Sequence, residues 1–142
     1  MVAGGRSGPA GGSGRSYTSF QACLLTGEQG LADPAAAPVW AGMQQASLAT
    51  DAKVSYLAVR GPQTADNALV FLNALMLRHC GLVLAAGRPE RDAVVAQAGK
   101  YPSVRFAVVG GTSTAPNVMV LSGGDAAVRD GTARQMSHAA GG

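Results

Sequence analysis

The sequence has few aromatic side chains, few charges and no long apolar run. Phe, Tyr and Trp make up 5% of the 142 residues, and Asp, Glu, Lys and Arg make up 13%. Proteins that bind single-stranded nucleic acid stack bases on aromatic rings, so this composition argues against a nucleic-acid partner. A net charge of +3 is too small to indicate a polyanion partner. No apolar run reaches the roughly 20 residues that a membrane-spanning helix needs.

Sequence motifs for catalysis and for metal or cofactor binding are also lacking. No serine lies in a nucleophile elbow, and neither His79 nor His138 has a Cys, Asp or Glu at metal-ligand spacing. Gly27 and Gly30 do not form the G-x-G-x-x-G fingerprint of dinucleotide-binding proteins. We therefore expect a protein that is not an enzyme and that holds neither a metal ion nor a cofactor.

The first 19 residues are rich in Gly and Ser. This composition predicts a disordered linker or tail, and the segment lacks the apolar core of a signal peptide. From residue 20 to residue 140 the composition is that of one globular α/β domain. The cellular location cannot be read from the N-terminal segment.

Strand-like and helix-like segments alternate through this domain. Apolar runs predict strands at 21–26, 53–60, 81–86, 104–109 and 117–121, and helices are predicted after Pro38, after Thr64, over 88–100 and over 125–138. Continuous apolar strands that alternate with helices are typical of a parallel sheet covered on both faces. We predict a doubly wound, five-stranded parallel sheet in the order 2-1-3-4-5. Ligands of such sheets bind at the carboxyl ends of the strands, here 27–33, 87–91 and 110–116.

Two of these loops carry charged side chains that have two interpretations each. Asp33 could contact a ligand hydroxyl, but it precedes Pro34, and we favour its interpretation as the N-cap of the following helix. Arg88 could meet an anion at a helix N-terminus, although a solvated loop is the better interpretation. The sequence alone leaves the ligand-binding role of both residues open.

The two cysteines lie on strands that the predicted order makes neighbours. Cys23 is in the first strand and Cys80 directly precedes the third. Neighbouring strands lie about 4.8 Å apart, within the Cα separation that a disulfide bridges. A Cys23–Cys80 disulfide and two buried free thiols are equally compatible with this placement.

Several separated stretches together resemble one known family. These are LLTGEQGLAD, VWAGM, LAAGRPERDAVVAQAGKYPSVRFAVVGG and APNVMVL. In this order they resemble the amino-terminal lobe of the basic membrane protein (BMP) family, as found in short actinobacterial BMP-like proteins. That family consists of substrate-binding proteins of ABC transporters, and its best-understood members bind nucleosides. The resemblance implies a single lobe of the type I periplasmic-binding-protein, flavodoxin-like fold.

The chain departs from the BMP pattern where the family contacts its ligand. Asp33 is kept, but the Lys-Ser-Phe-Asn that usually follows is replaced by Pro-Ala-Ala-Ala, which removes the aromatic ring that stacks on the base. Gly110 stands where the family carries an aspartate. The resemblance places Asp33, Gly87, Arg88 and Gly110 at the ligand loops. Without the family's second lobe, the ligand would be only partly buried, so binding would be weak.

The resemblance also implies an extracytoplasmic location at the cell surface or in the medium. Export favours the Cys23–Cys80 disulfide over two free thiols. Any membrane attachment would need an anchor that this sequence does not carry. We therefore expect a non-enzymatic, BMP-like domain that binds a small, nucleoside-like metabolite weakly. The alternative is a protein-interaction or dimerisation module that has lost its ligand, with a homodimer or a second protein covering the cleft face.

Overall fold

The computed structural model describes residues 20–141, so the predicted N-terminal linker lies outside the described residues. The strands are β1 (Gln21–Thr26), β2 (Lys53–Ala58), β3 (Leu82–Ala85), β4 (Arg105–Val109) and β5 (Val118–Leu121), and the helices are α1 (Ala37–Thr50), α2 (Ala65–Leu77), α3 (Arg88–Gln97) and α4 (Asp125–Gly141). Two short 3-10 turns, η2 (Gly30–Ala32) and η3 (Ala98–Lys100), precede α1 and follow α3. Every helix within residues 20–141 is too short or too polar to cross a membrane.

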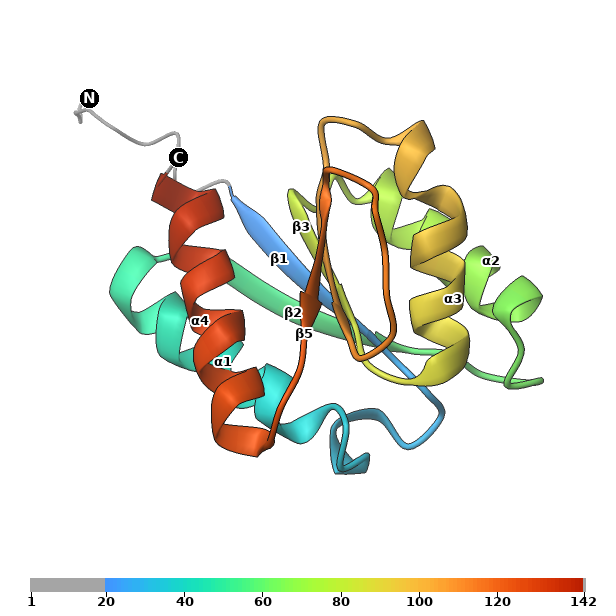
Figure 1. The fold of residues 1–142 in the computed structure, drawn as a ribbon, viewed down its shortest axis with the longest axis horizontal. Coiled ribbons are helices and arrows are strands. Elements are labelled where there is room, and N and C mark those ends of the chain that lie inside the picture. Colours follow the sequence, from blue (N-terminus) through green and yellow to red (C-terminus); the bar gives the residue numbers. More distant parts are fainter. Residues whose placement is uncertain (1–19, 142) are drawn as a thin grey trace, which may run out of the picture.

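The five strands form one parallel sheet in the order β2-β1-β3-β4-β5 (Figure 1). This confirms the fold class, the strand order and the helices on both faces that the sequence predicts. The strand order changes side at β1: β2 lies on one side of it, and β3, β4 and β5 follow on the other side. In a doubly wound sheet, the loops beyond the carboxyl ends at this point are the usual place for a ligand.

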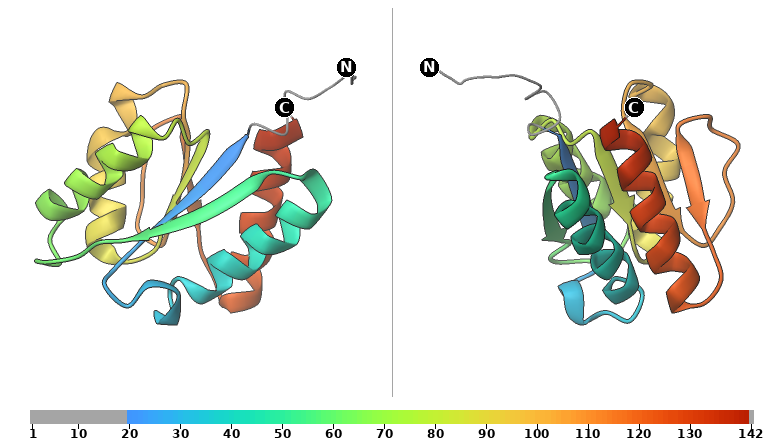
Figure 2. Two further views of the ribbon diagram at one scale, coloured as in Figure 1. Left: turned by 180° about the vertical axis from the view of Figure 1, so that it is seen from behind. Right: turned by 90° about the vertical axis from the view of Figure 1, so that its left-hand side faces the viewer.

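Alternate residues of each strand point to opposite faces of the sheet, and each face has its own helical layer (Figure 2). Ala22 and Leu24 of β1 pack in the layer of α1 and α4. Cys23 and Leu25 pack in the layer of α2 and α3. The central strands are therefore buried on both sides, which explains why they read as continuous apolar runs.

Helices α1 and α4 touch through a glycine. A Cβ atom at Gly42 of α1 would overlap the backbone carbonyl oxygen of Arg129 and lie 2.9 Å from the Cβ of Thr132, both in α4. Only a residue without a side chain allows the two helices to come this close. Trp40, two residues earlier, is half-buried and packs edge-on against Tyr56 of β2 with 5.6 Å between ring centroids.

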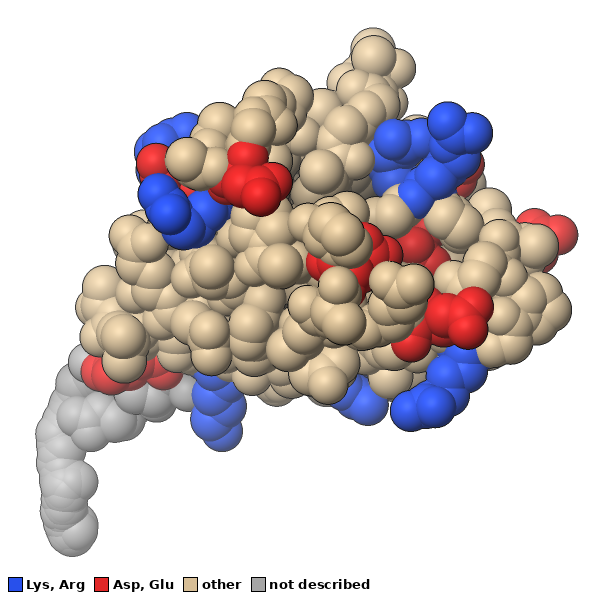
Figure 3. All heavy atoms as spheres, turned by 90° about the horizontal axis from the view of Figure 1, so that it is seen from below, with Lys and Arg blue, Asp and Glu red and all other residues tan. Residues whose placement is uncertain are grey.

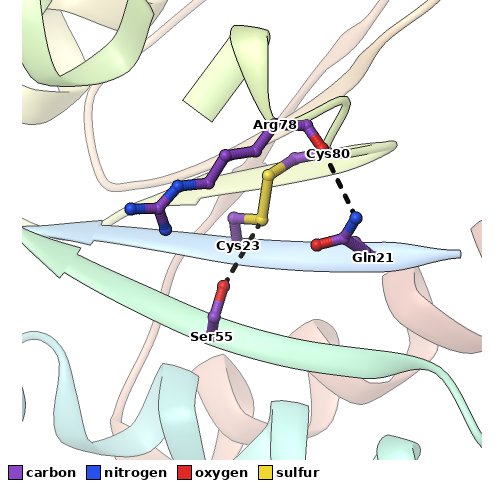
Figure 4. Close-up of a disulfide and its surroundings, with 5 residues drawn as sticks. All are labelled: Gln21, Cys23, Ser55, Arg78 and Cys80. Carbon is purple, nitrogen blue, oxygen red and sulfur yellow. Dashed lines mark hydrogen bonds between the residues drawn. A yellow bond between two sulfur atoms is a disulfide. The ribbon is translucent and has the colours of Figure 1, made fainter. Parts of the chain in front are cut away.

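A disulfide joins Cys23 to Cys80, with Cα atoms 6.1 Å apart and 57 positions apart in the sequence (Figure 4). The disulfide alternative of the sequence analysis is therefore confirmed. Cys23 also accepts a hydrogen bond at 3.7 Å from the Ser55 hydroxyl on β2, and the Gln21 side-chain amide donates to the carbonyl of Arg78 at 3.3 Å. These contacts tie β1, β2 and the segment that precedes β3 together near the amino-terminal end of the sheet.

The connection from β4 to β5 contains no helix and returns along the sheet as an extended segment (Figure 2). At its end, the side-chain Nδ2 of Asn117 donates to the carbonyl oxygens of Ala98, Tyr101 and Val104, each at 3.0 Å. One amide thus holds the start of β5 against the whole turn between α3 and β4. The contact fixes the start of β5 relative to α3 and β4, although no helix connects β4 to β5.

Candidate functional site

The loops that follow β1, β2 and β3 meet at the carboxyl end of the sheet. Viewed from that end, the surface has acidic side chains near its middle and basic side chains nearer its margins (Figure 3). The loop after β1 carries Gly27 and Asp33, the loop after β2 carries Gln63, and Gly87 separates β3 from α3. The loops after β1 and β3 are two of the three at which the fold predicts a ligand.

Three side-chain oxygens from three different elements converge over Gly27. The position that a Cβ atom would take on Gly27 lies 3.3 Å from Gln63 Oε1, 3.8 Å from Asp33 Oδ2 and 3.9 Å from Glu90 Oε1. Because Gly27 has no side chain, the space among these oxygens is not filled by its own residue. We refer to Asp33 Oδ2, Gln63 Oε1 and Glu90 Oε1 as the three-oxygen cluster.

Glu90 reaches this cluster because its side chain folds back over Gly87. Glu90 lies in the first turn of α3 and is only 1% exposed. A Cβ atom at Gly87 would collide with Glu90 Oε1, and Gly87 has a φ of +115°, a backbone conformation that favours glycine. Gly87 therefore makes room for the Glu90 carboxyl and also turns the chain into α3.

Hydrogen bonds offset the burial of the Glu90 carboxyl only in part. Its Oε2 atom is buried and has no hydrogen-bond partner among the described residues. Burial raises the pKa of Glu90 above its ordinary value, the nearby charge of Asp33 raises it further, and a hydrogen bond from the backbone N–H of Glu90 opposes these effects in part. A buried acceptor of this kind costs stability unless a donor is supplied, so it is unusual in a purely structural position.

Asp33 does not cap α1, contrary to the interpretation that we favoured from the sequence. The N-cap of α1 is Ala36, which makes no side-chain capping bond, and Pro38 occupies the first turn, where its lack of an N–H costs little. Instead, Asp33 Oδ1 accepts from the backbone N–H of Ala35 at 2.9 Å and closes a turn. This contact fixes the Asp33 carboxyl and leaves Oδ2 facing Gly27.

The other predicted ligand residues divide into two groups. Gly87 lies against Glu90 and thus belongs to the same site as Asp33. Gly110 has a φ of +76°, and a Cβ atom there would lie 3.4 Å from Arg91 Nη1. Arg88 is exposed on the first turn of α3. The structure therefore brings Asp33 and Gly87 together through Glu90 and places Gly110 beside Arg91. The ligand-binding roles of all four residues stay predictions.

Sequence reasoning placed Gly27 and Glu90 in the predicted ligand loops without giving either a role, and it missed Gln63. One signal was present, because Glu90 follows Gly87 by three residues, the spacing at which a glutamate folds back over a helix N-terminus. Nothing in the sequence pointed to Gln63, which follows an exposed loop. Among residues 20–141, no group of three or more His, Cys, Asp or Glu side chains could hold a metal ion.

A groove lies at the opposite end of the sheet. Its volume is about 420 Å³, and its lining includes Arg105 and Phe106 at the start of β4, Val118 and Met119 at the start of β5, and Gln135 of α4. The loops at the carboxyl ends of β1 and β3 do not line it. At the carboxyl end, a hollow of about 360 Å³ lies between Arg91 and Val95 of α3 and Gly111 of the loop after β4.

Comparisons with known proteins support the fold and leave the family open. No protein-family model matches the chain, and no curated protein matches it in sequence. Among solved structures, the chain is similar to a fragment from Peptoclostridium difficile 630 that is assigned as a lipoprotein. The TM-score is 0.63 at 13% identity, over 87% of this chain and 94% of that one.

Two longer proteins share the same fold over part of their length. One is an ABC transporter solute-binding protein from Aeropyrum pernix K1, with a TM-score of 0.58 and 17% identity over 71% of this chain and 28% of that chain. The other is a transcriptional activator of the comK gene from Bacillus halodurans, with a TM-score of 0.58 and 16% identity over 70% of this chain and 33% of that chain. The described domain is thus an α/β lobe like those of solute-binding proteins. The resemblance to the BMP family stays a resemblance.

Proposed function

We propose that this chain is a non-enzymatic, extracytoplasmic domain that binds a small metabolite at the carboxyl end of its sheet. The observation that carries the proposal is the three-oxygen cluster over Gly27, at the position where doubly wound sheets bind ligands. The Cys23–Cys80 disulfide supports an oxidising compartment, since disulfides persist mainly outside the cytoplasm. The similarity to a solute-binding protein and to a fragment assigned as a lipoprotein supports the same class of function.

Nucleosides are the first ligand class to test. The resemblance to the BMP family implies them, and ribose hydroxyls can donate to the carboxylate of Asp33. The structure places no aromatic ring in the loop segment Pro34–Ala37 to stack on a base, so we expect dissociation constants in the millimolar range. A single lobe also leaves much of the ligand in water.

A thermal-unfolding screen of the chain against nucleosides, nucleobases and other small metabolites tests this proposal. A ligand that binds only the folded state raises the melting temperature as its concentration exceeds its dissociation constant. Asp33→Ala should abolish the shift, whereas Glu28→Ala, which removes an exposed carboxyl from the same loop, should leave it unchanged. A flat screen across all classes at millimolar concentration would contradict the proposal.

One observation favours a second candidate, dimerisation through the edge of the sheet. β2 is an edge strand, and Tyr56 on it is 45% exposed beside the half-buried Trp40. An exposed strand edge offers unpaired backbone groups to a second chain. A mass in solution that rises with protein concentration, and that Tyr56→Lys keeps monomeric, would favour this candidate.

A further inference from the structure

The sheet has two edge strands, and they differ in how open they are to a second chain. Among the described strands β2 pairs only with β1, in an unbroken register from Lys53 to Ala58. In the left view of Figure 2, β2 lies in front of the rest of the sheet. β5 is shorter, and the backbone N–H of Val118, which points away from β4, already donates to the carbonyl of Ala115 at 3.2 Å. β2 therefore offers the longer open edge.

Alternate residues of β2 direct their backbone groups to β1 and to the open edge. Lys53 and Val59 each donate a backbone N–H to the chain segment that contains β1, at 3.0 and 2.8 Å. Backbone groups alternate in direction along a strand, so the odd-numbered residues between these two also face β1. The residues that turn both N–H and C=O to the open edge are Val54, Tyr56 and Ala58. None of the three is charged or is proline, the features by which edge strands resist a partner.

We propose that β2 pairs with β2 of a second copy of this chain, antiparallel and about a two-fold axis at Tyr56. The inference rests on the second candidate function, dimerisation through this edge, and names its partner and its register. In an antiparallel pair, two opposite residues exchange two hydrogen bonds when the backbone groups of both face the partner strand. With Tyr56 opposite Tyr56, Val54 lies opposite Ala58 in both directions. All three outward-facing residues of each copy then exchange hydrogen bonds, and the two sheets become one.

Other registers use the open edge less completely. A shift by one residue sets outward-facing groups of one copy against residues of the other that face β1, so the ladder cannot form. A shift by two residues leaves one of the three outward-facing residues opposite a position beyond the end of β2. The register centred on Tyr56 is therefore the one that pairs every free backbone group of the strand. It also closes on itself by two-fold symmetry, the commonest symmetry of soluble homo-oligomers.

The exposed side chain at the proposed two-fold axis is aromatic. Tyr56 is 45% exposed, and its ring packs edge-on against Trp40 on the α1 face of the sheet, with 5.6 Å between ring centroids. Directly opposite residues of an antiparallel pair place their side chains side by side on the same face. The Tyr56 rings of the two copies are thus neighbours at the centre of the interface. Pairing buries aromatic surface that a separate copy leaves in water.

The charges beside β2 also fit a second copy. Lys53, the charged residue within β2, lies at its first position and comes opposite Val59 of the second copy. Arg60 comes opposite Ala52 and therefore next to Asp51 of that copy, and Arg60 and Asp51 are both exposed. Like charges that lie directly opposite each other destabilise a strand pair, and this register has none. The acidic residue before β2 and the basic residue after it are thus complementary in an antiparallel dimer.

Sedimentation equilibrium of the full chain at several concentrations tests the inference. The interface of one strand pair is small, so the mass should rise towards twice that of one chain between micromolar and millimolar concentration. Tyr56→Lys places two like charges at the two-fold axis and should raise the dissociation constant at least about tenfold. Met119→Lys is the matched control, since Met119 is 46% exposed on β5, the other edge strand. A wild-type mass that stays that of one chain, or an equal loss of association in Met119→Lys, overturns the inference.

Photo-oxidative cross-linking of neighbouring tyrosines tests the register. Opposite residues of a hydrogen-bonded antiparallel pair have Cα atoms about 5.5 Å apart, so the two Tyr56 rings are within reach of a direct bond. The wild type should give a covalent dimer with dityrosine fluorescence. Tyr56→Phe should keep the mass of the dimer and lose the cross-link, and the control Tyr101→Phe should keep both. A cross-link that is as strong in Tyr56→Phe as in the wild type overturns the register.

The proposals fail in different ways. A metabolite that raises the melting temperature of the monomeric Tyr56→Lys variant keeps the metabolite proposal, whatever the dimer experiments show. Association that Tyr56→Lys prevents, without a cross-link through Tyr56, keeps dimerisation through β2 and overturns the two-fold axis at Tyr56. Association that Met119→Lys prevents and Tyr56→Lys leaves intact places the contact at β5, and it overturns both the inference and the second candidate function.

Discussion

The two ends of the sheet differ in the covalent bonds and hydrogen bonds of their polar side chains. At the amino-terminal end, a disulfide joins Cys23 to Cys80, and the amide of Asn117 donates to three backbone carbonyls. At the carboxyl end, Glu90 is buried, and its Oε2 has no hydrogen-bond partner within residues 20–141. At the amino-terminal end the polar side chains named here have partners, while the end predicted to meet a ligand buries one carboxyl oxygen that the described residues do not satisfy.

Removing the disulfide should have the largest effect on this division. The double variant Cys23→Ala, Cys80→Ala opens a link between residues 57 positions apart, and loop-closure entropy predicts a loss of about 4 kcal/mol in the free energy of unfolding. Urea unfolding of the oxidised wild type and the variant measures this loss. A loss below about 1 kcal/mol would show that the amino-terminal end does not depend on the bond.

Replacing Glu90 should have a smaller effect of opposite sign. Because the pKa of Glu90 is raised in the folded state, the folded state holds more protons than the unfolded state above the ordinary Glu pKa of about 4.3. The free energy of unfolding of the wild type should therefore fall as pH rises from this value through the raised pKa. Glu90→Gln should remove that fall and should stabilise the protein at pH 7 by about 1–3 kcal/mol.

Unfolding of both proteins at pH 4 and at pH 7 measures this difference. Glu28→Gln is the matched control, because Glu28 is exposed in the neighbouring loop and its replacement should change neither value. If Glu90→Gln is destabilising at pH 7, the carboxylate has a partner that stabilises it, and the contrast between the two ends is lost.

Replacing Arg88 should have the smallest effect. Arg88 is exposed on the first turn of α3, so Arg88→Ala should change the free energy of unfolding by no more than about 0.5 kcal/mol. The melting shift with any ligand of the three-oxygen cluster should also be unchanged. A weaker ligand response in Arg88→Ala would extend the site along α3 and restore the anion-binding interpretation of this residue.

The fold could be predicted from the sequence because its determinants are local. Each buried strand is a continuous apolar run, and β1 has the bounds that the run 21–26 predicts. The ends of strands and helices were predicted less accurately. β2 ends at Ala58 rather than at residue 60, and α3 ends at Gln97 rather than at residue 100, because a 3-10 turn follows it as far as Lys100. These are places where a helix or strand frays into a loop with similar side chains.

The candidate site could be predicted only in part, because its geometry depends on contacts between distant residues. The position of Asp33 follows from the fold, but its role in a turn depends on how the chain passes Ala35. Glu90 looks like an ordinary first-turn acid until Gly87 is seen to leave room for it. Gln63 lies 36 positions after Gly27, and no local pattern indicates that the two meet.

The amide of Asn117 has a consequence for the order in which the molecule assembles. Its three acceptors, the carbonyls of Ala98, Tyr101 and Val104, are brought together only once α3 and β4 have met at their turn. The last strand therefore has no complete docking place until α3 and β4 have packed together. We expect β5 to join after this turn has formed, and α4, whose Val128 and Met136 belong to the core on the α1 face, to complete that core.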